Sequence, residues 1–197
     1  YVRDPADMTA YIQNLKNKFG SKVMIGEFGA PIPDLNGPMT EDQQADFVDK
    51  IFQQLYINRD TVEGMNYWDL TDGSTALLNP DQSPRKVTDV IKKYFDPAIV
   101  EGKVMTTHKH PLADILIKTN DDTLTIKTDV NGNYSFPTPL TDIQLEVEFG
   151  DKVASASVSN IEPGKIYTRN FVFRRPKLTL SEQIQEFLEK FLKSSSY

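Results

Sequence analysis

The sequence contains no cysteine, which excludes disulfide bonds, a thiol nucleophile and a zinc–thiolate site. Histidine is scarce, with two residues among 197, and there is one tryptophan. No apolar run approaches the length of a membrane span, and no signal peptide is visible. Acidic residues outnumber basic ones by 28 to 22, so the net charge is −6, which argues against nucleic acid or anionic membrane as a partner.

The composition is otherwise that of a globular protein. Hydrophobic residues make up 39% of the chain and charged residues 25%. The length suffices for one large domain or two small ones. Because the chain begins with Tyr1 rather than methionine, close to a predicted helix start, we expect it to be a processed or truncated piece of a longer protein.

A short strand that ends in a single carboxylate is predicted early in the chain. Val23, Met24 and Ile25 form an apolar run without helical spacing, and glycines flank Glu27. Such a run, bounded by Gly and Pro, is typical of a strand in a parallel sheet that is buried on both faces. An acid at the C-terminal end of this strand occupies the place where α/β barrels carry their chemistry. A capping or ion-pairing glutamate remains an equally open interpretation.

Strand alternation predicts which side chains of this segment share a face. Val23, Ile25 and Glu27 are expected on one face, with Met24 and Phe28 on the other.

A second strand is predicted over residues 64–70, and the same rule applies to it. Gly64, Asn66 and Trp68 should share one face, while Met65 and Tyr67 should point toward the helices.

Three amphipathic helices accompany the two strands. The first begins at Asp4–Pro5, where a capping residue precedes proline, and it ends at Gly20. The second opens with Thr40 and Gln43, which have the spacing of a capping box. The third begins at Ser83–Pro84.

The order helix, strand, helix, strand, helix describes two consecutive βα units of a parallel sheet. A polar loop over residues 31–39 separates the first strand from the second helix. Two strands alone make no sheet that three amphipathic helices would cover. Residues 1–96 are therefore predicted to be two βα units, about a quarter, of a partial (β/α)8 TIM barrel. The remaining barrel strands must come from upstream sequence or from another chain.

Two motifs in this part resemble those of a known enzyme family. Ile25-Gly-Glu-Phe-Gly29 resembles the seventh-strand motif of family 5 glycoside hydrolases and related retaining (β/α)8 enzymes of clan A, and Asn66-Tyr-Trp-Asp69 resembles their eighth strand. The resemblance implies that Glu27 is the nucleophile and that Trp68 lies under the sugar at the cleavage point. Asn66 would hydrogen-bond the substrate or Glu27. The resemblance further implies an extracellular or cell-surface enzyme.

A retaining glycosidase needs a second carboxyl group, about 5–5.5 Å from the nucleophile, to protonate the leaving oxygen. In the family that acid follows an asparagine, and no Asn-Glu pair occurs in this chain. The acid/base residue is therefore expected outside the chain. For Trp68, a buried core position is the alternative to a sugar platform.

After Asp96–Pro97 helical spacing gives way to short alternating runs, which predict a seven-stranded antiparallel β-sandwich over residues 98–175. Val100–Val104, Pro111–Leu112 and Thr128–Phe136 are similar to the carboxypeptidase-regulatory-like, prealbumin-type domain. In that family the Asp-x-x-Gly-x-Tyr segment is a hairpin turn that leads to a core tyrosine. The resemblance implies a fold and almost nothing about function.

Two possible metal sites in this region are rejected. Asp129, Asn131 and Asn133 alternate like the start of a calcium loop, but the glycine falls at the fourth place rather than the sixth. His108 and His110 have no third ligand nearby. We therefore predict no metal and no cofactor.

A last amphipathic helix is predicted over residues 178–193. Its polar face has mixed charge, unlike the basic face of a membrane-surface helix.

Three function hypotheses remain open. The first is part of a retaining glycoside hydrolase that acts on a polysaccharide or oligosaccharide. The second is a non-catalytic binding or spacer module whose barrel segment is a remnant. The third is an α/β domain of unrelated chemistry. An upstream strand with an Asn-Glu pair would favour the first.

Overall fold

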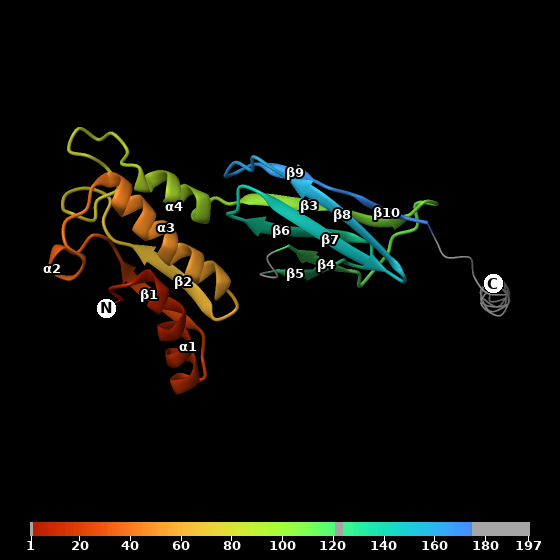
Figure 1. The fold of residues 1–197 in the computed structure, drawn as a ribbon, viewed down its shortest axis with the longest axis horizontal. Helices are drawn as coiled ribbons and strands as arrows, with labels where there is room; N and C mark the ends of the chain where they lie inside the picture. The colour runs from red at the N-terminus through yellow and green to blue at the C-terminus, as the bar shows by residue number, and fades with distance from the viewer. Residues whose placement is uncertain (1, 121–123, 175–197) are drawn as a thin grey trace, which may run out of the picture. The chain divides into compact units, whose positions relative to one another are not determined.

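The structure is a computed structural model that describes residues 2–120 and 124–174. It combines helices and sheets, as predicted, and contains no closed barrel within the described ranges (Figure 1). The elements, in chain order, are η1 (Pro5–Asp7), α1 (Met8–Phe19), β1 (Val23–Phe28), α2 (Pro33–Asn36), α3 (Glu41–Ile57), β2 (Val62–Tyr67), α4 (Val87–Phe95), β3 (Ala98–Thr106), β4 (Leu116–Thr119), β5 (Thr125–Lys127), β6 (Asn133–Thr138), β7 (Ile143–Phe149), β8 (Lys152–Val158), β9 (Ile166–Thr168) and β10 (Phe171–Phe173).

Contacts divide the chain into two compact units. Among the described residues, the first unit reaches Val100 and also contains Phe136–Ile143 and Val158–Tyr167. The second unit contains the other described residues. The predicted domain limits stay a prediction. The helix predicted over 178–193 lies outside the described residues. No helix in the described part of the chain is long and apolar enough to span a membrane.

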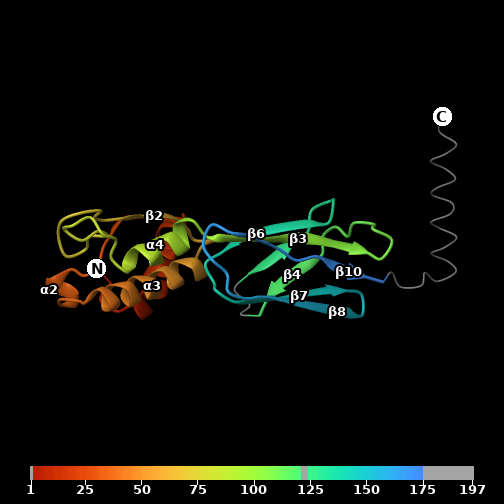
Figure 2. The same ribbon diagram turned by 90° about the horizontal axis from the view of Figure 1, so that it is seen from above.

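β1 and β2 pair in parallel, as predicted, with Met24 opposite Gly64 and Ile25 opposite Met65. A buried core lies between this pair and the helices, which cover it through Met8 and Ile12 of α1 and through the apolar stripe of α3. α3 and α4 lie side by side (Figure 2). A part-buried ion pair of 2.9 Å between Lys93 and Asp49 joins them.

The predicted face of Phe28 is wrong. Val23, Ile25 and Phe28 all pack against the helix core, whereas Gly26 and Glu27 are both exposed. The register between the strands shifts between Ile25 and Phe28, so β1 takes one more residue than β2 over this stretch. An extra residue of this kind reverses the alternation of the side chains that follow it. The irregularity therefore gives Glu27 its exposed position.

Most predicted helix limits are confirmed. Gly20 ends α1 in the left-handed conformation, and Thr40 and Gln43 form the capping box of α3. The Asp4 side chain accepts a hydrogen bond from Ala6 N, as a cap should, but it caps the 3-10 helix η1, and α1 itself begins at Met8 without a side-chain cap.

Two predictions about the loops are wrong. The predicted polar loop 31–39 contains one helical turn, α2, with Pro33 at its start. α4 begins at Val87, later than predicted, because Pro84 forms a β-bridge with Leu78 and Asn79 N donates to Ser83 O.

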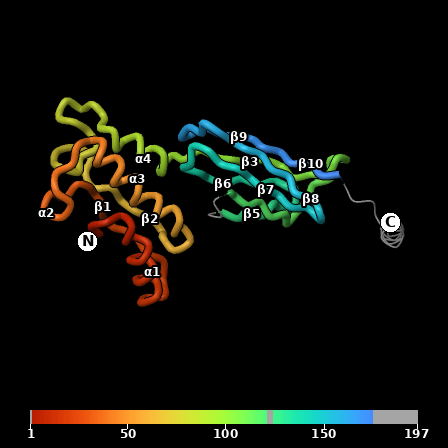
Figure 3. The backbone as a smooth tube through the Cα atoms, viewed as in Figure 1, coloured from red at the N-terminus to blue at the C-terminus, as the bar shows by residue number. Residues whose placement is uncertain are grey.

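The region after Asp96 forms two four-stranded sheets. One has the order β10-β3-β6 with β9 also paired to β3, and the other has the order β5-β4-β7-β8. β9 and β10 both run along β3 (Figure 3). The predicted alternation is confirmed, since Leu145, Val147, Phe171 and Phe173 are all buried.

The strand count and the purely antiparallel pairing were predicted wrongly. Residues 98–120 and 124–174 hold eight strands, β3–β10, one more than predicted. Three of them, β5, β9 and β10, have three residues each, which is too few for alternation to fix a strand count. β10 pairs with β3 in parallel. The chain reaches β10 by crossing from β8 to the other sheet rather than by a hairpin, and a crossover permits parallel pairing.

The turn predicted around Asp129 is present, and Tyr134 after it is buried. The Asp129 carboxylate accepts hydrogen bonds from Asn131 N and Asn133 N, each 2.8 Å long, and these bonds lower the pKa of Asp129. The turn is not a hairpin, because the strands it joins, β5 and β6, lie in different sheets.

We expect Leu145→Ala to lower the free energy of unfolding by about 2–5 kcal/mol, because the substitution leaves a cavity at a fully buried position. Val153→Ala serves as the control, since this valine is 60% exposed, and should change the free energy by about 0.5 kcal/mol or less. Urea unfolding followed by circular dichroism measures both. Equal effects would contradict the placement of β7 in the core.

Candidate functional site

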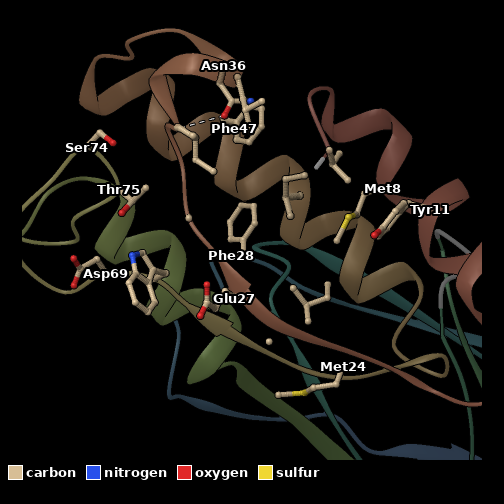
Figure 4. A pocket seen from close by; sticks show the side chains of 18 of the residues that line it. Met8, Tyr11, Met24, Glu27, Phe28, Asn36, Phe47, Asp69, Ser74 and Thr75 are labelled. Carbon is tan, nitrogen blue, oxygen red and sulfur yellow. Dashed lines mark hydrogen bonds between the residues drawn. The ribbon is translucent and has the colours of Figure 1, made fainter.

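A groove of about 720 Å³ opens at the C-terminal end of β1. Its walls come from α1, β1, the loop that follows β1, α3 and the loop that follows β2. Figure 4 shows Glu27 and Asp69 in this groove, with Met8 and Tyr11 of α1 on another side. The groove therefore joins a polar end, at the strand termini, to an apolar end beside α1.

Glu27 lies at the polar end of the groove and is exposed. Within residues 2–120 and 124–174 its carboxylate forms no hydrogen bond or ion pair, so the capping and ion-pairing interpretations find no partner there. A carboxylate in this position is free to meet a ligand.

Trp68 also lines the groove, with 58% of the residue exposed, so it is not a core residue in the described chain. Its backbone N–H donates to Phe28 O at 2.6 Å, which brings the end of β2 against the residue that follows Glu27. The peptide bonds Ala30–Pro31 and Trp68–Asp69 are cis. Asn66, the third predicted site residue, is exposed but does not line the groove.

Gly29 allows the two strand ends to approach closely. A Cβ atom at this position would overlap the carbonyl oxygen of Trp68 and would lie 3.0 Å from Cγ2 of Thr75. A glycine is therefore required for the backbone contact that sets Glu27 beside Trp68.

A buried polar network that the sequence did not predict ties together the loops after β1 and β2. Gln44 of α3 is 2% exposed, and its Nε2 donates to Ala30 O at 2.8 Å and lies 3.3 Å from Thr75 O and Ala76 O. Tyr67 Oη donates to Thr75 O at 2.9 Å.

A signal for Gln44 was available in the sequence. It precedes Val48 and Ile51 by four and seven residues, so a polar side chain falls on the apolar stripe of the helix.

The groove carries negative charge. Glu27, Asp69 and Asp72 line it, and none of its described lining residues is Lys, Arg or His. Nowhere in the described ranges do three His, Asp or Glu residues group in a way that would hold a metal ion.

Asn36 lines the groove near Phe47 (Figure 4). Only one of the two polar atoms of its side chain has a hydrogen-bond partner in the described residues. Its Oδ1 accepts from Ile32 N at 3.2 Å. Its Nδ2 is buried and has no acceptor among the residues that the structure describes. A buried donor without an acceptor is unfavourable, so this amide group is available to hydrogen-bond water or a ligand in the groove.

Comparisons with known proteins leave the family open. No protein-family model matches the chain, and no curated protein matches it. The resemblances to family 5 glycoside hydrolases and to the prealbumin-type domain therefore stay predictions.

Among solved structures, the chain is similar to β-glucuronidase 2 of Bacteroides uniformis covalently bound to cyclophellitol-6-carboxylate aziridine, with 13% identity, 85% of this chain and 25% of that chain covered, and a TM-score of 0.37. It is also similar to the FMN-binding β-glucuronidase from Facaelibacterium prausnitzii L2-6, with 12% identity, coverage of 81% and 30%, and a TM-score of 0.39. The Bacillus anthracis TIE protein matches with 8% identity, coverage of 41% and 17%, and a TM-score of 0.34.

Glycoside hydrolases are thus among the similar structures, and the chain spans about a quarter of the length of the first β-glucuronidase. At these low TM-scores and identities we base no argument on the similarities.

We expect Gly29→Ala to disturb the site, because its Cβ would overlap the Trp68 carbonyl oxygen. The emission maximum of Trp68, the one tryptophan of the chain, should shift, and the protein should unfold at lower urea concentration.

Gly26→Ala is the matched control, since a Cβ there meets nothing within 4 Å. The close approach of the strand ends would be refuted if both variants kept the emission maximum and the urea midpoint of the unmodified chain.

Proposed function

We propose that this chain is part of a retaining glycoside hydrolase that cleaves O-glycosidic bonds of a polysaccharide or oligosaccharide. The supporting observation is that an unpaired, exposed carboxylate, Glu27, and an exposed aromatic ring, Trp68, end two neighbouring parallel strands at the same groove. Parallel strands of α/β barrels present catalytic groups at this end. The two strands with α1, α3 and α4 are, in this proposal, the last two βα units of a TIM barrel related to family 5 and clan A.

In the first step a carboxylate oxygen of Glu27 attacks the anomeric carbon and forms an ester with the glycosyl group. The bond to the leaving oxygen breaks, and a carboxylic acid donates its proton to that oxygen. In the second step the same group, now a carboxylate, takes a proton from water, whose oxygen attacks the anomeric carbon and releases Glu27. Trp68 holds the sugar ring by contact with its C–H face.

The acid/base residue belongs, in this proposal, to polypeptide outside the 197 residues, together with the other barrel strands. In the described chain β1 and β2 pair only with each other, so each has a free edge. Tyr11 and Met24 leave apolar surface exposed along the groove, and Asn36 has a buried donor to satisfy. A neighbouring strand would pair with the edge of β1 and cover this surface.

We propose that the sugar bound beside Glu27, Asp69 and Asp72 is uncharged. The described lining contributes carboxylates from Glu27, Asp69 and Asp72 and no cation. A sugar carboxylate would be repelled by these charges, whereas hydroxyl groups would find acceptors.

The strands β3–β10 would serve as a prealbumin-type sandwich that supports the catalytic part. They carry no complete metal-ligand set in the described residues, and the sequence places its single tryptophan in the catalytic part rather than here. An extracellular or cell-surface location follows from the family resemblance alone and belongs to the same proposal.

We expect Glu27→Gln in the complete enzyme to lower kcat by about 10³-fold or more, because the amide keeps the shape of the side chain but removes the nucleophile. Substrate binding should change little. Steady-state kinetics with an aryl glycoside measures both, and a fluorosugar inactivator should label the peptide that contains Glu27.

The matched control is Glu63→Gln, which makes the same chemical change on β2 at an exposed carboxylate outside the groove. Near-normal turnover of Glu27→Gln, or a label on another peptide, would refute the assignment of Glu27.

The 197-residue chain alone should show no glycosidase activity, because the acid/base residue and most of the substrate cleft are missing. The apolar end of its groove should bind an uncharged hydrophobic dye such as Nile red and should promote self-association. Tyr11→Glu, at an exposed position of the groove, should reduce both signals. A monodisperse monomer that binds no dye would contradict the proposal that further barrel strands normally cover this groove.

A further inference from the structure

Gln44 is a buried amide in an otherwise apolar layer. The capping box of Thr40 and Gln43 fixes the start of α3, and Gln44 follows directly, on the side of Val48 and Ile51, which are both buried. Burial of an amide without partners is unfavourable, so the hydrogen bonds of Gln44 must offset the loss of its contacts with water. Those bonds go to backbone carbonyl oxygens, and the acceptors lie in two different loops.

Tyr67 approaches the same acceptors from β2. Its Oη donates to Thr75 O at 2.9 Å and lies 3.4 Å from Ala30 O. A tyrosine hydroxyl is protonated at neutral pH, and burial raises the pKa of Tyr67 further, so this group remains a donor. Ala30 O and Thr75 O are therefore each contacted by both Gln44 and Tyr67.

These carbonyl oxygens belong to the backbone segments that carry the candidate site. Ala30 lies three residues after Glu27, and Thr75 lies in the loop that begins at Trp68. Ser74 adds a further link between the same loops, since its Oγ donates to Pro31 O at 2.8 Å.

We propose that Gln44 and Tyr67 are positioning residues that fix the backbone of Glu27 relative to that of Trp68. The proposal rests on the proposed function for its catalytic consequence, but the geometry on which it stands does not depend on that function. Neither Gln44 nor Tyr67 lines the groove, so both act from behind the site through the backbone of its two loops. Displacement of a catalytic group by about 1 Å is enough to lower a rate by about 10²-fold.

The first test uses the 197-residue chain labelled with 5-fluorotryptophan, which gives one ¹⁹F resonance because Trp68 is the only tryptophan. Gln44→Met keeps the length of the side chain and removes its donors. We expect the resonance to shift, broaden or split while the circular dichroism spectrum stays that of a folded chain. Tyr67→Phe removes one hydroxyl group and should shift the resonance less. It also provides a second variant if Gln44→Met does not fold.

The matched control is Val48→Ala, which destabilises the same face of α3 without removing any bond to the two loops. A purely structural role of Gln44 predicts that Val48→Ala changes the resonance as much as Gln44→Met does. A positioning role predicts that Val48→Ala leaves the resonance in place.

The second test measures kinetics of the complete enzyme. Gln44→Met should lower kcat by about 10–100-fold with little change in KM, because it misplaces the nucleophile without removing a contact to the substrate. Val48→Ala should keep the kcat of the unmodified enzyme at a temperature where it is folded.

The outcomes separate the two proposals. The positioning role would be overturned if both Gln44→Met and Tyr67→Phe kept the ¹⁹F resonance of the unmodified chain, or if both kept its kcat in the complete enzyme. Either result would leave the proposed function standing. Changed resonances in the 197-residue chain, together with a complete enzyme that hydrolyses no glycoside, would support the positioning role and refute the proposed function.

Discussion

The candidate site depends on one irregularity in the pairing of two parallel strands. Between Ile25 and Phe28, β1 takes one residue more than β2 takes between Met65 and Tyr67. Phe28 therefore turns into the helix layer and meets Tyr67 edge-to-face at 5.9 Å. Glu27 is left on the exposed side. With regular alternation the carboxylate and the phenyl ring would exchange places. An unpaired carboxylate would then lie among apolar side chains, where a charge is strongly disfavoured, and the aromatic ring would lie in the groove.

A two-stranded sheet keeps such a register shift only if other elements pack against it. In the described chain, tight packing is present on one side of the sheet only. Toward the helices, the core reaches complete burial at Ile12, Val48 and Val87. On the other side the edge of β1 is free and the groove runs along it as far as α1. α1 is held to α3 partly by polar contacts, such as Thr9 Oγ1 to Gln54 Oε1 at 2.6 Å. The apolar surface of α1 thus remains available to a further strand, consistent with the proposed incomplete barrel.

Much of this structure could be predicted from local sequence signals because each signal acts over a few residues. The glycine that ends α1, the capping box that begins α3, the parallel pair of strands and the alternation in β7 all follow from such short-range rules. The later start of α4 could not be predicted, because a bridge between Leu78 and Pro84 competes with the helix. The parallel pairing of β10 depends on a crossover between sheets, which no local pattern records. The helix predicted over 178–193 lies outside the described residues.

Three departures from local rules lie close together. A strand that breaks alternation at Glu27, an amphipathic helix that places Gln44 on its apolar stripe, and a glycine required at position 29 lie at the same end of the same strand pair. Each departure alone is unfavourable or neutral for folding, so stability gives no reason for all three to occur together. Natural sequences depart from consistency mainly where function demands it. The coincidence of the three at one end of this strand pair is therefore an argument for the site that is independent of any family resemblance.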